Sequence, residues 1–560
     1  MARKIAPIVL VVAAVLLLTQ PAYLADTGRY IIEIQNHRAH LMDAGQDPFW
    51  DFGHAAWRPL VNAVYGFAGS TVESIRGGNE RQALAWLMIA MNVLATMAAV
   101  LLLWLLLVRH CNFAAASLGA AAFLCTNSIL DYSRSGAPYI PALAALVLAL
   151  WLIQSGEDRQ RAGRWGILWF AGAGLSLGAA VVLWFPFVLA VPAAILYALS
   201  DVKLALPSRR KGAAILIVFL GLSTTAVYAA VMHQRHIQTR AQFTKWVASS
   251  SNDWSQTDKL KRAVSGIPRS FLDLGDDTLL LKRYVFHDPY NPVTLRQILF
   301  AGGTIKLVLF YLYLGAVVVT LWKQHQERLV LLLAAGALPV LVFAVTLFEP
   351  GSTERYLPAY PFFFLAAAAA LPVGGRRFRA LQWAMAAFLI GVLCVGNCYG
   401  KLEFRGAAAY RAFLERKNIL EAQAQPDSMV AVINFWDPLY ATPPLRLLDS
   451  AAQPRKLWVY DVIEVANTRV FRWRQQFAGY AAAHWAEGRQ VWLSKRLLAD
   501  KPLPQWKWVE GDTGRVPWSA VREFFGSLDV ADRVGGDDGF VLVAKDPRNM
   551  EFIGRQAGQP

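Results

Sequence analysis

The sequence predicts a polytopic α-helical membrane protein that ends in a small α/β domain. Of the 560 residues, 56% are hydrophobic and 17% are charged, and the mean hydropathy is +0.35. The core of a soluble protein of this length cannot bury so many apolar side chains, so lipid must solvate much of the surface. The apolar residues also form runs of span length up to residue 398, and the composition becomes more polar after it.

Each span is predicted from an apolar run of about 20 residues, the length that crosses a bilayer as a helix. Trp184, Phe185 and Pro186 lie at the junction of the fifth and sixth runs. They permit either a kink in one long span or a turn between two short spans. The first run also permits a cleaved signal peptide as an alternative. We expect about eleven transmembrane helices, at residues 5–24, 84–108, 113–130, 138–153, 166–183, 185–199, 212–232, 298–322, 329–348, 357–372 and 381–398.

The charge pattern orients these spans. Lys and Arg outnumber Asp and Glu by 55 to 39, which gives a net charge of +16. A nucleic-acid-binding protein would present this charge as a basic face on a soluble domain, whereas here the basic residues lie between apolar runs. With Arg3 and Lys4 in the cytoplasm, the other basic loops also fall inside only if residues 166–199 form two spans. We therefore exclude nucleic acid as a partner and expect a bacterial-type cytoplasmic (inner) membrane protein with its N-terminus inside.

This topology divides the chain into two predicted domains. Residues 1–398 form the transmembrane domain, with outer loops at residues 25–83 and 233–297, and residues 399–560 form an extracytoplasmic α/β domain. Short apolar runs at residues 429–435, 490–494 and 540–544 predict strands of that domain. The four cysteines fall in or beside apolar runs, which indicates packing residues rather than a disulfide-stapled module.

The first outer loop contains the strongest candidate for chemistry. Asp43, Asp47 and Asp51 fall within nine positions among several aromatic residues. Asp47 and Pro48 predict the start of a short helix that ends at Pro59, and spacings of three and four place Asp51, His54 and Arg58 on one of its faces. Mutual repulsion should raise the pKa of at least one acid, which suits a general base. The alternative is an interfacial amphipathic helix whose acids only cap and solvate it.

Two further outer loops each place an arginine among hydroxyl groups at the end of a span. The earlier loop contains Asp131, Tyr132 and Arg134, and the later one contains Glu354, Arg355 and Tyr356. Arginine binds phosphate oxygens in a bidentate manner, which suits a lipid phosphate headgroup at this depth. The alternatives are snorkelling to the interface and local ion pairs. The long loop at residues 233–297 suits a cover over a cavity or a structural cap.

These motifs together resemble the GT-C-type polytopic membrane glycosyltransferases, which include protein O-mannosyltransferases and the aminoarabinose transferases of lipid A. The resemblance rests on Leu41-Met42-Asp43-Ala44-Gly45, on Gly53-His54 with Trp57-Arg58-Pro59-Leu60, and on Glu354-Arg355-Tyr356-Leu357-Pro358 before a late span. It covers about residues 1–398. The sequence departs from members with adjacent Asp and Glu, since Ala44 follows Asp43, and this leaves Asp43, Asp47 and Asp51 all open as the base.

The resemblance implies a polyprenyl-phosphate-linked sugar donor and a lipid, polysaccharide or protein acceptor. It implies catalysis by Asp43 and Asp51, with Asp43 as the base in an inverting transfer. Substrate binding would fall to His54, Arg58, Asp131, Tyr132, Arg134, Glu354, Arg355 and Tyr356. A divalent cation held by the first-loop acids is also compatible with the sequence, which leaves metal dependence open.

Two other classes of protein share some of these features. A lipid-linked substrate transporter or flippase would also have many spans, but polar residues here collect on one outer side rather than at midplane. A non-catalytic envelope assembly protein would use the outer α/β domain to bind a partner. Convergence of Asp43, Asp51, Arg134 and Arg355 in one cavity would favour the enzyme, and dispersed positions would favour assembly.

Overall fold

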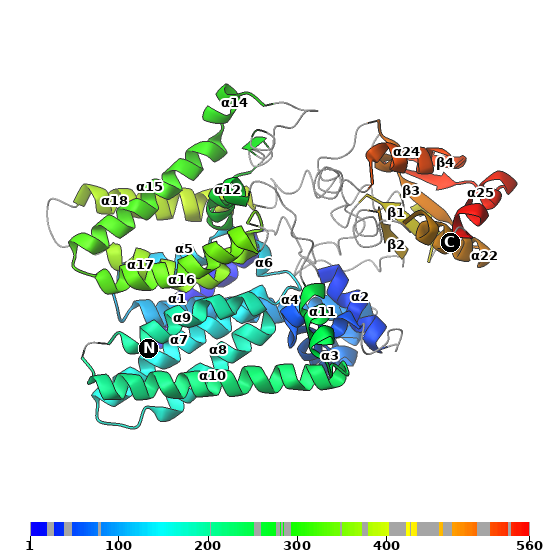
Figure 1. The fold of residues 1–560 in the computed structure, drawn as a ribbon. Helices are drawn as coiled ribbons and strands as arrows, with labels where there is room; N and C mark the ends of the chain where they lie inside the picture. The colour runs from blue at the N-terminus through cyan, green and yellow to red at the C-terminus, as the bar shows by residue number, and fades with distance from the viewer. Residues whose placement is uncertain are drawn as a thin grey trace. The chain divides into compact units, whose positions relative to one another are not determined.

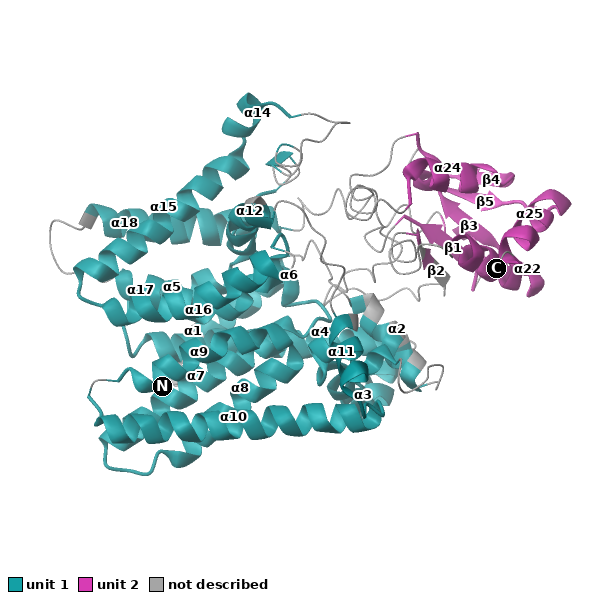
Figure 2. Ribbon diagram, viewed as in Figure 1, with its two compact units in different colours: residues 1–254, 258–405 teal, residues 255–257, 406–560 magenta. Residues whose placement is uncertain are grey.

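The computed structural model forms two compact units, residues 1–254 with 258–405 and residues 255–257 with 406–560 (Figure 2). The first unit thus extends past the predicted boundary and includes Lys401. The structure describes residues 2–19, 27–38, 47–76, 80–201, 203–250, 259–275, 280–281, 284, 293–347, 350–371, 379–402, 420, 422–425, 427–433, 458–462, 473–500, 516–535 and 539–558.

The first unit is a bundle of apolar helices that lie side by side (Figure 1). Among the described residues, six helices are long and apolar enough to cross a membrane, within α4, α7, α10, α15, α16 and the segment from α18 to α19. The protein is therefore a mostly helical, multi-pass integral membrane protein. The elements are α1 (Ala2–Leu18), α4 (Glu80–Leu107), α5 (Phe113–Leu124), α6 (Asn127–Tyr132), α7 (Tyr139–Arg161), α8 (Ile167–Leu183), η3 (Phe185–Ala190), α9 (Val191–Leu199), α10 (Leu206–Gln234), α15 (Gly302–Lys323), α16 (Glu327–Thr346), η4 (Thr353–Ala359), α17 (Tyr360–Ala370), α18 (Arg379–Ala387), the π-helix η6 (Phe388–Gly396) and α19 (Asn397–Gly400).

Each predicted span overlaps a helix of this bundle, but several of them are not continuous α-helices. The span at residues 185–199 begins with the 3-10 helix η3, and the span at residues 381–398 contains the π-helix η6. Two further breaks lie beside polar side chains. The span predicted at residues 113–130 breaks between α5 and α6, where Cys125 caps the first helix and Thr126 precedes the second. The span predicted from residue 357 begins inside η4, a 3-10 helix. These two breaks, before α6 and in η4, lie beside polar residues that were predicted to bind substrate. Helix α6 contains Asp131 and Tyr132, and η4 contains Glu354 and Arg355.

The chain turns back between the fifth and sixth predicted spans. Arg161 at the end of α7 binds Asp201, which follows α9, at 2.5 Å. Helix α8 begins a few residues after Arg161, so the start of α8 and the end of α9 lie at the same end of the bundle. Trp184 is extended and η3 makes the turn. Two short segments are thus correct, and the single kinked span is wrong.

A cluster of short elements lies at the end of the bundle that is reached by the C-terminus of α10 (Figure 1). The predicted helix at residues 47–59 is wrong in form, because two 3-10 turns fill most of this segment and α3 begins at Trp57, with Pro59 in its first turn. Pro59 is compatible with a first turn because the N–H groups there have no helical partner. The elements of this cluster are α2 (Thr27–Arg38), η1 (Pro48–Trp50), η2 (Phe52–His54), α3 (Trp57–Arg76) and α11 (Arg240–Ser249). Helices α12 (Lys259–Phe271) and α14 (Leu295–Leu299) lie elsewhere, and α14 directly precedes α15 (Figure 1).

The second unit is a small α/β fold with a five-stranded mixed sheet in the order β2-β1-β3-β5-β4. The predicted strands at residues 429–435, 490–494 and 540–544 correspond to β1, β3 and β5. The pairs β1–β2 and β1–β3 are parallel, whereas β5 is antiparallel to β3 and β4. The elements are β1 (Met429–Val432), β2 (Trp458–Asp461), α22 (Trp473–Ala486), β3 (Val491–Ser494), η7 (Lys495–Leu498), α24 (Trp518–Gly526), β4 (Val530–Val534), β5 (Phe540–Val543) and α25 (Pro547–Ala557).

Both faces of this sheet are covered, and the alternation of side chains along β1 shows why. Met429 and Ala431 point to a core that includes Phe477 and Phe525 of α22 and α24. Val430 and Val432 point to the opposite core with Trp492. A strand that is buried on both faces requires apolar residues at every position, and β1 has them.

Candidate active site

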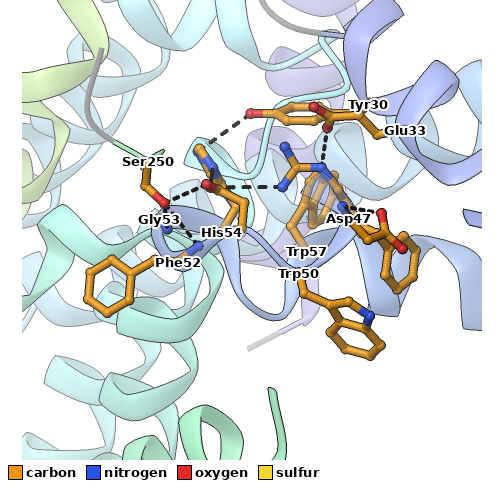
Figure 3. Close-up of polar contacts among 12 residues, drawn as sticks. Tyr30, Glu33, Asp47, Trp50, Phe52, Gly53, His54, Trp57 and Ser250 are labelled. Carbon is orange, nitrogen blue, oxygen red and sulfur yellow. Dashed lines mark hydrogen bonds and ion pairs between the residues drawn. The ribbon is translucent and has the colours of Figure 1, made fainter. Parts of the chain in front are cut away.

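The carboxylate of Asp51 is the centre of a polar cluster in the segment predicted as the first outer loop, which we call the first outer segment after that prediction. Figure 3 shows His54 and Ser250, two of the side chains that contact this carboxylate. Its Oδ2 lies 2.8 Å from His54 Nδ1 and 3.9 Å from an NH group of Arg58. Its Oδ1 accepts a hydrogen bond of 2.5 Å from the Ser250 hydroxyl at the end of α11. The expected grouping of Asp51, His54 and Arg58 is therefore present, although 3-10 turns produce it rather than one helix.

The surroundings of Asp51 stabilise its ionised form. Burial acts to raise the pKa of this carboxyl group, but the hydrogen bond and charge of His54, the charge of Arg58 and the Ser250 hydroxyl together hold the pKa well below its usual range. The expectation that neighbouring acids raise the pKa is wrong for Asp51, because its contacts are donors and cations. A carboxylate with so low a pKa is a weak base and suits the role of orienting His54 and Arg58.

Arg58 is held from a second side by α2. Its Nε donates to Oε2 of the buried Glu33, and its guanidinium lies over the Tyr30 ring at 4.7 Å from the centroid. The Tyr30 hydroxyl also lies 3.4 Å from His54 Nε2 (Figure 3). Glu33 and Asp51 thus flank one arginine and fix its position. A guanidinium has five N–H donors, so these contacts are compatible with a further bond to an anionic ligand.

Asp47 has a local structural role in the described segment. Its Oδ1 accepts a 2.9 Å hydrogen bond from the Phe49 N–H and caps η1, and its Oδ2 lies 2.5 Å from His37 Nδ1. The His37 ring stacks on Phe49 at 3.7 Å between centroids. Both carboxylate oxygens are therefore engaged within the segment, which makes Asp47 a poor candidate for the base.

The segment after α10, which was predicted as the second long outer loop, holds the first outer segment in place. Arg235, one residue after α10, donates to the carbonyl oxygens of Asp47 and Trp50 at 3.2 and 3.1 Å. The indole of Trp246 in α11 donates to the same Trp50 carbonyl at 2.8 Å. Ser250 also accepts the N–H groups of Phe52 and Gly53 at 3.0 and 3.3 Å. The segment after α10 thus fixes the backbone on which Asp51 stands.

A second polar cluster joins the two later outer loops. The hydroxyl of Tyr132 at the end of α6 donates to Glu354 Oε2 at 2.7 Å, and Glu354 Oε1 lies 3.5 Å from Arg355 Nε. Asp131 binds Lys401 at 2.6 Å. All of these side chains are buried or nearly so. The structure therefore links Tyr132, Glu354 and Arg355, and it places Lys401 on the neighbouring Asp131.

Two aromatic side chains connect the two clusters. Tyr139 lies 6.4 Å from His54, 4.9 Å from Tyr132 and 4.6 Å from Trp184, between ring centroids. The guanidinium of Arg355 lies 5.6 Å from the Trp184 ring. Helix η3 packs against both η2 and η4, which accounts for this convergence. We call Tyr139 and Trp184 the aromatic bridge.

Two of the predicted substrate-binding residues, Arg134 and Tyr356, bind backbone carbonyl groups of the protein itself. Arg134 donates to the carbonyls of Leu16 and Thr19 and to the Thr19 hydroxyl, so it caps the C-terminus of α1. The Tyr356 hydroxyl donates to the Pro350 carbonyl at 2.6 Å and stabilises the turn before η4.

The catalytic candidate Asp43 lies outside the described residues. Among those that the structure describes, no group of three or more His, Cys, Asp or Glu side chains is arranged to hold a metal ion. The motifs of the sequence did not point to Glu33, Ser250, Lys401 or the aromatic bridge. Glu33 follows Tyr30 by three residues, about one helical turn, and this spacing can be read from the sequence. No local sequence pattern indicates Ser250 or Lys401.

Residues 75–228 match the family model described as dolichyl-phosphate-mannose-protein mannosyltransferase. Together with the helical bundle, this match confirms the expected resemblance: the chain is a polytopic membrane protein with the GT-C glycosyltransferase fold. Its fold is similar to that of ArnT from Cupriavidus metallidurans. The apo structure has a TM-score of 0.53 and 11% identity, and the one bound to undecaprenyl phosphate has 0.51 and 12%; both cover 100% of this chain and 99% of ArnT. No curated protein matches this chain by sequence.

Proposed function

We propose that this protein transfers a sugar from a polyprenyl-phosphate donor to a hydroxyl acceptor at the outer face of the cytoplasmic membrane. The observation that carries the proposal is the aromatic bridge, which joins the Asp51, His54 and Arg58 cluster to the Glu354 and Arg355 cluster. Proximity of these two clusters supports an enzyme over an assembly protein, although of the four residues named for this test it involves only Asp51 and Arg355, since Arg134 binds the end of α1 and Asp43 lies outside the described residues. The similar ArnT structure with undecaprenyl phosphate supports a lipid-phosphate donor.

Two arginines are suited to bind the donor phosphate. Arg355 lies against the aromatic bridge, and Arg58 lies at the other cluster, held by Glu33 and Asp51. A preorganised cation stabilises the charge that develops on a leaving phosphate without reorganisation during the reaction. We assign the phosphate to Arg355 with Arg58 and not to Arg134, because the guanidinium of Arg134 binds the end of α1.

The transfer step needs a base for the acceptor hydroxyl. In this proposal Asp43 takes the hydroxyl proton, the oxygen attacks the anomeric carbon with inversion, and the bond from that carbon to the phosphate oxygen breaks. Polyprenyl phosphate leaves with the bonding electron pair. Asp43 is the first-segment candidate that is left, since Asp47 caps η1 and Asp51 is held ionised by its donors. Asp51 and Ser250 then act as positioning residues.

Transfer is tested with the full chain in vesicles that contain labelled polyprenyl-phosphate sugars. We expect the labelled sugar to move from the lipid phosphate to an acceptor that is extracted from the same membranes. We also expect cells that lack the protein to lose one glycan. Unchanged surface glycans and lipid-linked sugars in those cells, with no transfer in vesicles that bind the donor, would reject the proposal.

A further inference from the structure

A group of thiols connects the break between α5 and α6 to the last span of the membrane unit, because Cys125 contacts both Cys394 and Cys398. The Sγ atoms of Cys125 and Cys398 lie 3.5 Å apart, although the two residues are 273 positions apart in the chain. Cys125 is 4% exposed, and Cys398 is partly exposed. A disulfide has an S–S distance of about 2.05 Å, so closure requires the sulfur atoms to approach by about 1.5 Å.

The backbone on both sides of this pair is held in register. The Asn397 amide, next to Cys398, donates to the carbonyls of Cys125 and Phe271 at 2.8 and 2.7 Å. One turn further on, Lys401 binds Asp131 at 2.6 Å. These contacts on either side of Cys398 keep α19 against the end of α5. The two cysteines therefore stay within reach of each other as long as the bundle is folded.

The predicted topology places this pair at the outer end of the bundle. In that topology the span of Cys125 runs outward from an inner loop that contains Cys111, and the last span also runs outward to Cys398. Thiols at the outer face meet an oxidising compartment, whereas those at the inner face stay reduced. Cys111 lies just after α4 and donates to the Leu107 carbonyl of that helix at 3.2 Å, so it is a natural internal control.

We infer that Cys125 and Cys398 form a disulfide in the membrane-inserted protein. This bond would link the last helix covalently to the segment that contains Asp131 and Tyr132. The oxidant is a disulfide of an envelope thiol oxidase. The thiolate of the more exposed Cys398 attacks that disulfide and forms a mixed disulfide, and one oxidant thiolate leaves. Cys125 loses its proton and attacks the Cys398 sulfur, so that the second oxidant thiolate leaves. Two electrons and two protons leave the pair, and the oxidant disulfide is reduced to a dithiol.

The inference rests on the outward orientation and not on sugar transfer, so its test needs no activity. Intact cells with an oxidising outer compartment are quenched with N-ethylmaleimide, and the full chain is purified, reduced and labelled with a mass-tagged maleimide. We expect two new thiols after reduction in the wild type and in Cys111→Ser, and none in Cys125→Ser or Cys398→Ser. Peptide mass spectrometry without reduction should link the peptides of Cys125 and Cys398.

Three results would overturn the inference. Four alkylated cysteines in the wild type would show that no bridge forms. A linked pair that contains Cys394 would show that the pairing is wrong, and Cys394→Ser should leave the bridge intact. Labelling of Cys111 from outside by a membrane-impermeant maleimide would show reversed orientation. Reduction should also lower the unfolding temperature of the wild type by about 5 °C, and that of Cys398→Ser by much less.

Discussion

The Ser250 hydroxyl donates a hydrogen bond of 2.5 Å to the Asp51 carboxylate, although 199 residues separate the two in the chain. Ser250 stands at the end of α11 and also accepts two N–H groups of η2. Through this one side chain, the segment after α10 fixes both the backbone and the carboxylate of the first outer segment. The cluster around Asp51 is therefore built by two outer segments together.

Replacing Ser250 by Ala should weaken this coupling without removing a group that touches the substrate. We expect a loss of about 1–3 kcal/mol in stability, because two N–H groups and a buried carboxylate lose a partner. The turnover number should fall by a larger factor than the donor affinity. Thermal unfolding and donor titration measure the two effects. Thr244→Ala in the same helix, whose hydroxyl binds only the Arg240 carbonyl, is the control, and an equal effect there would contradict the assignment.

Asp43→Asn tests the proposed base. The amide cannot accept the acceptor's proton, so we expect turnover to fall on the order of a hundredfold or more while the donor still binds. Labelled sugar transfer in vesicles gives the rate, and donor titration shows that the site is intact. Near-wild-type turnover of this variant would remove Asp43 from the mechanism.

Arg355→Ala should weaken binding of the polyprenyl-phosphate donor by about tenfold to a hundredfold, because a charge-assisted contact to phosphate is lost. Arg355→Lys should recover part of the affinity, since it keeps the charge but not the planar guanidinium. Donor affinity is measured by titration of the purified chain. An affinity that does not change in Arg355→Ala would disprove the phosphate role.

Arg134→Ala is expected to act on stability instead. Its guanidinium binds the carbonyls of Leu16 and Thr19 at the end of α1, and those buried acceptors would lose a charged donor. We expect a loss on the order of 3 kcal/mol, seen as a lower unfolding temperature, with donor affinity of the folded fraction unchanged. A selective loss of donor affinity at normal stability would return Arg134 to the phosphate site.

The pKa of Asp51 predicts an acid-sensitive contribution to stability. The native pKa is held below the ordinary value of 3.8, so the ionised form stabilises the folded protein. This contribution is fully present above the ordinary pKa and is lost as the pH falls below it towards the native pKa. Asp51→Asn should therefore cost more stability at about pH 6 than at about pH 3. Unfolding temperatures of both proteins across this range test the sign, and the exposed Asp532→Asn serves as the control. A difference that grows towards low pH would contradict the assignment.

Much of the fold was predictable because the bilayer imposes a strong local rule. A span must be apolar over about 20 residues, so each run overlaps a helix, and the charges of the short loops separated α8 from α9. The rule does not detect where a span stops being helical. The break at Cys125 and the 3-10 helix at Thr353 depend on side chains from other helices, such as Asn397, which binds the Cys125 carbonyl.

The sequence by itself determined the class of protein and the spacing of Asp51, His54 and Arg58, because hydropathy and short-range spacing are local properties. Tertiary structure alone decided which partners these residues have. In the folded protein Ser250 binds Asp51, Glu33 binds Arg58 and Lys401 binds Asp131. The carbonyl groups at the end of α1 bind Arg134. A buried charge must find a partner or lose its charge, and in a folded chain that partner comes from whichever helix lies nearest in space. For this reason the candidate residues could be listed from the sequence, whereas their separation into positioning, binding and capping groups required the fold.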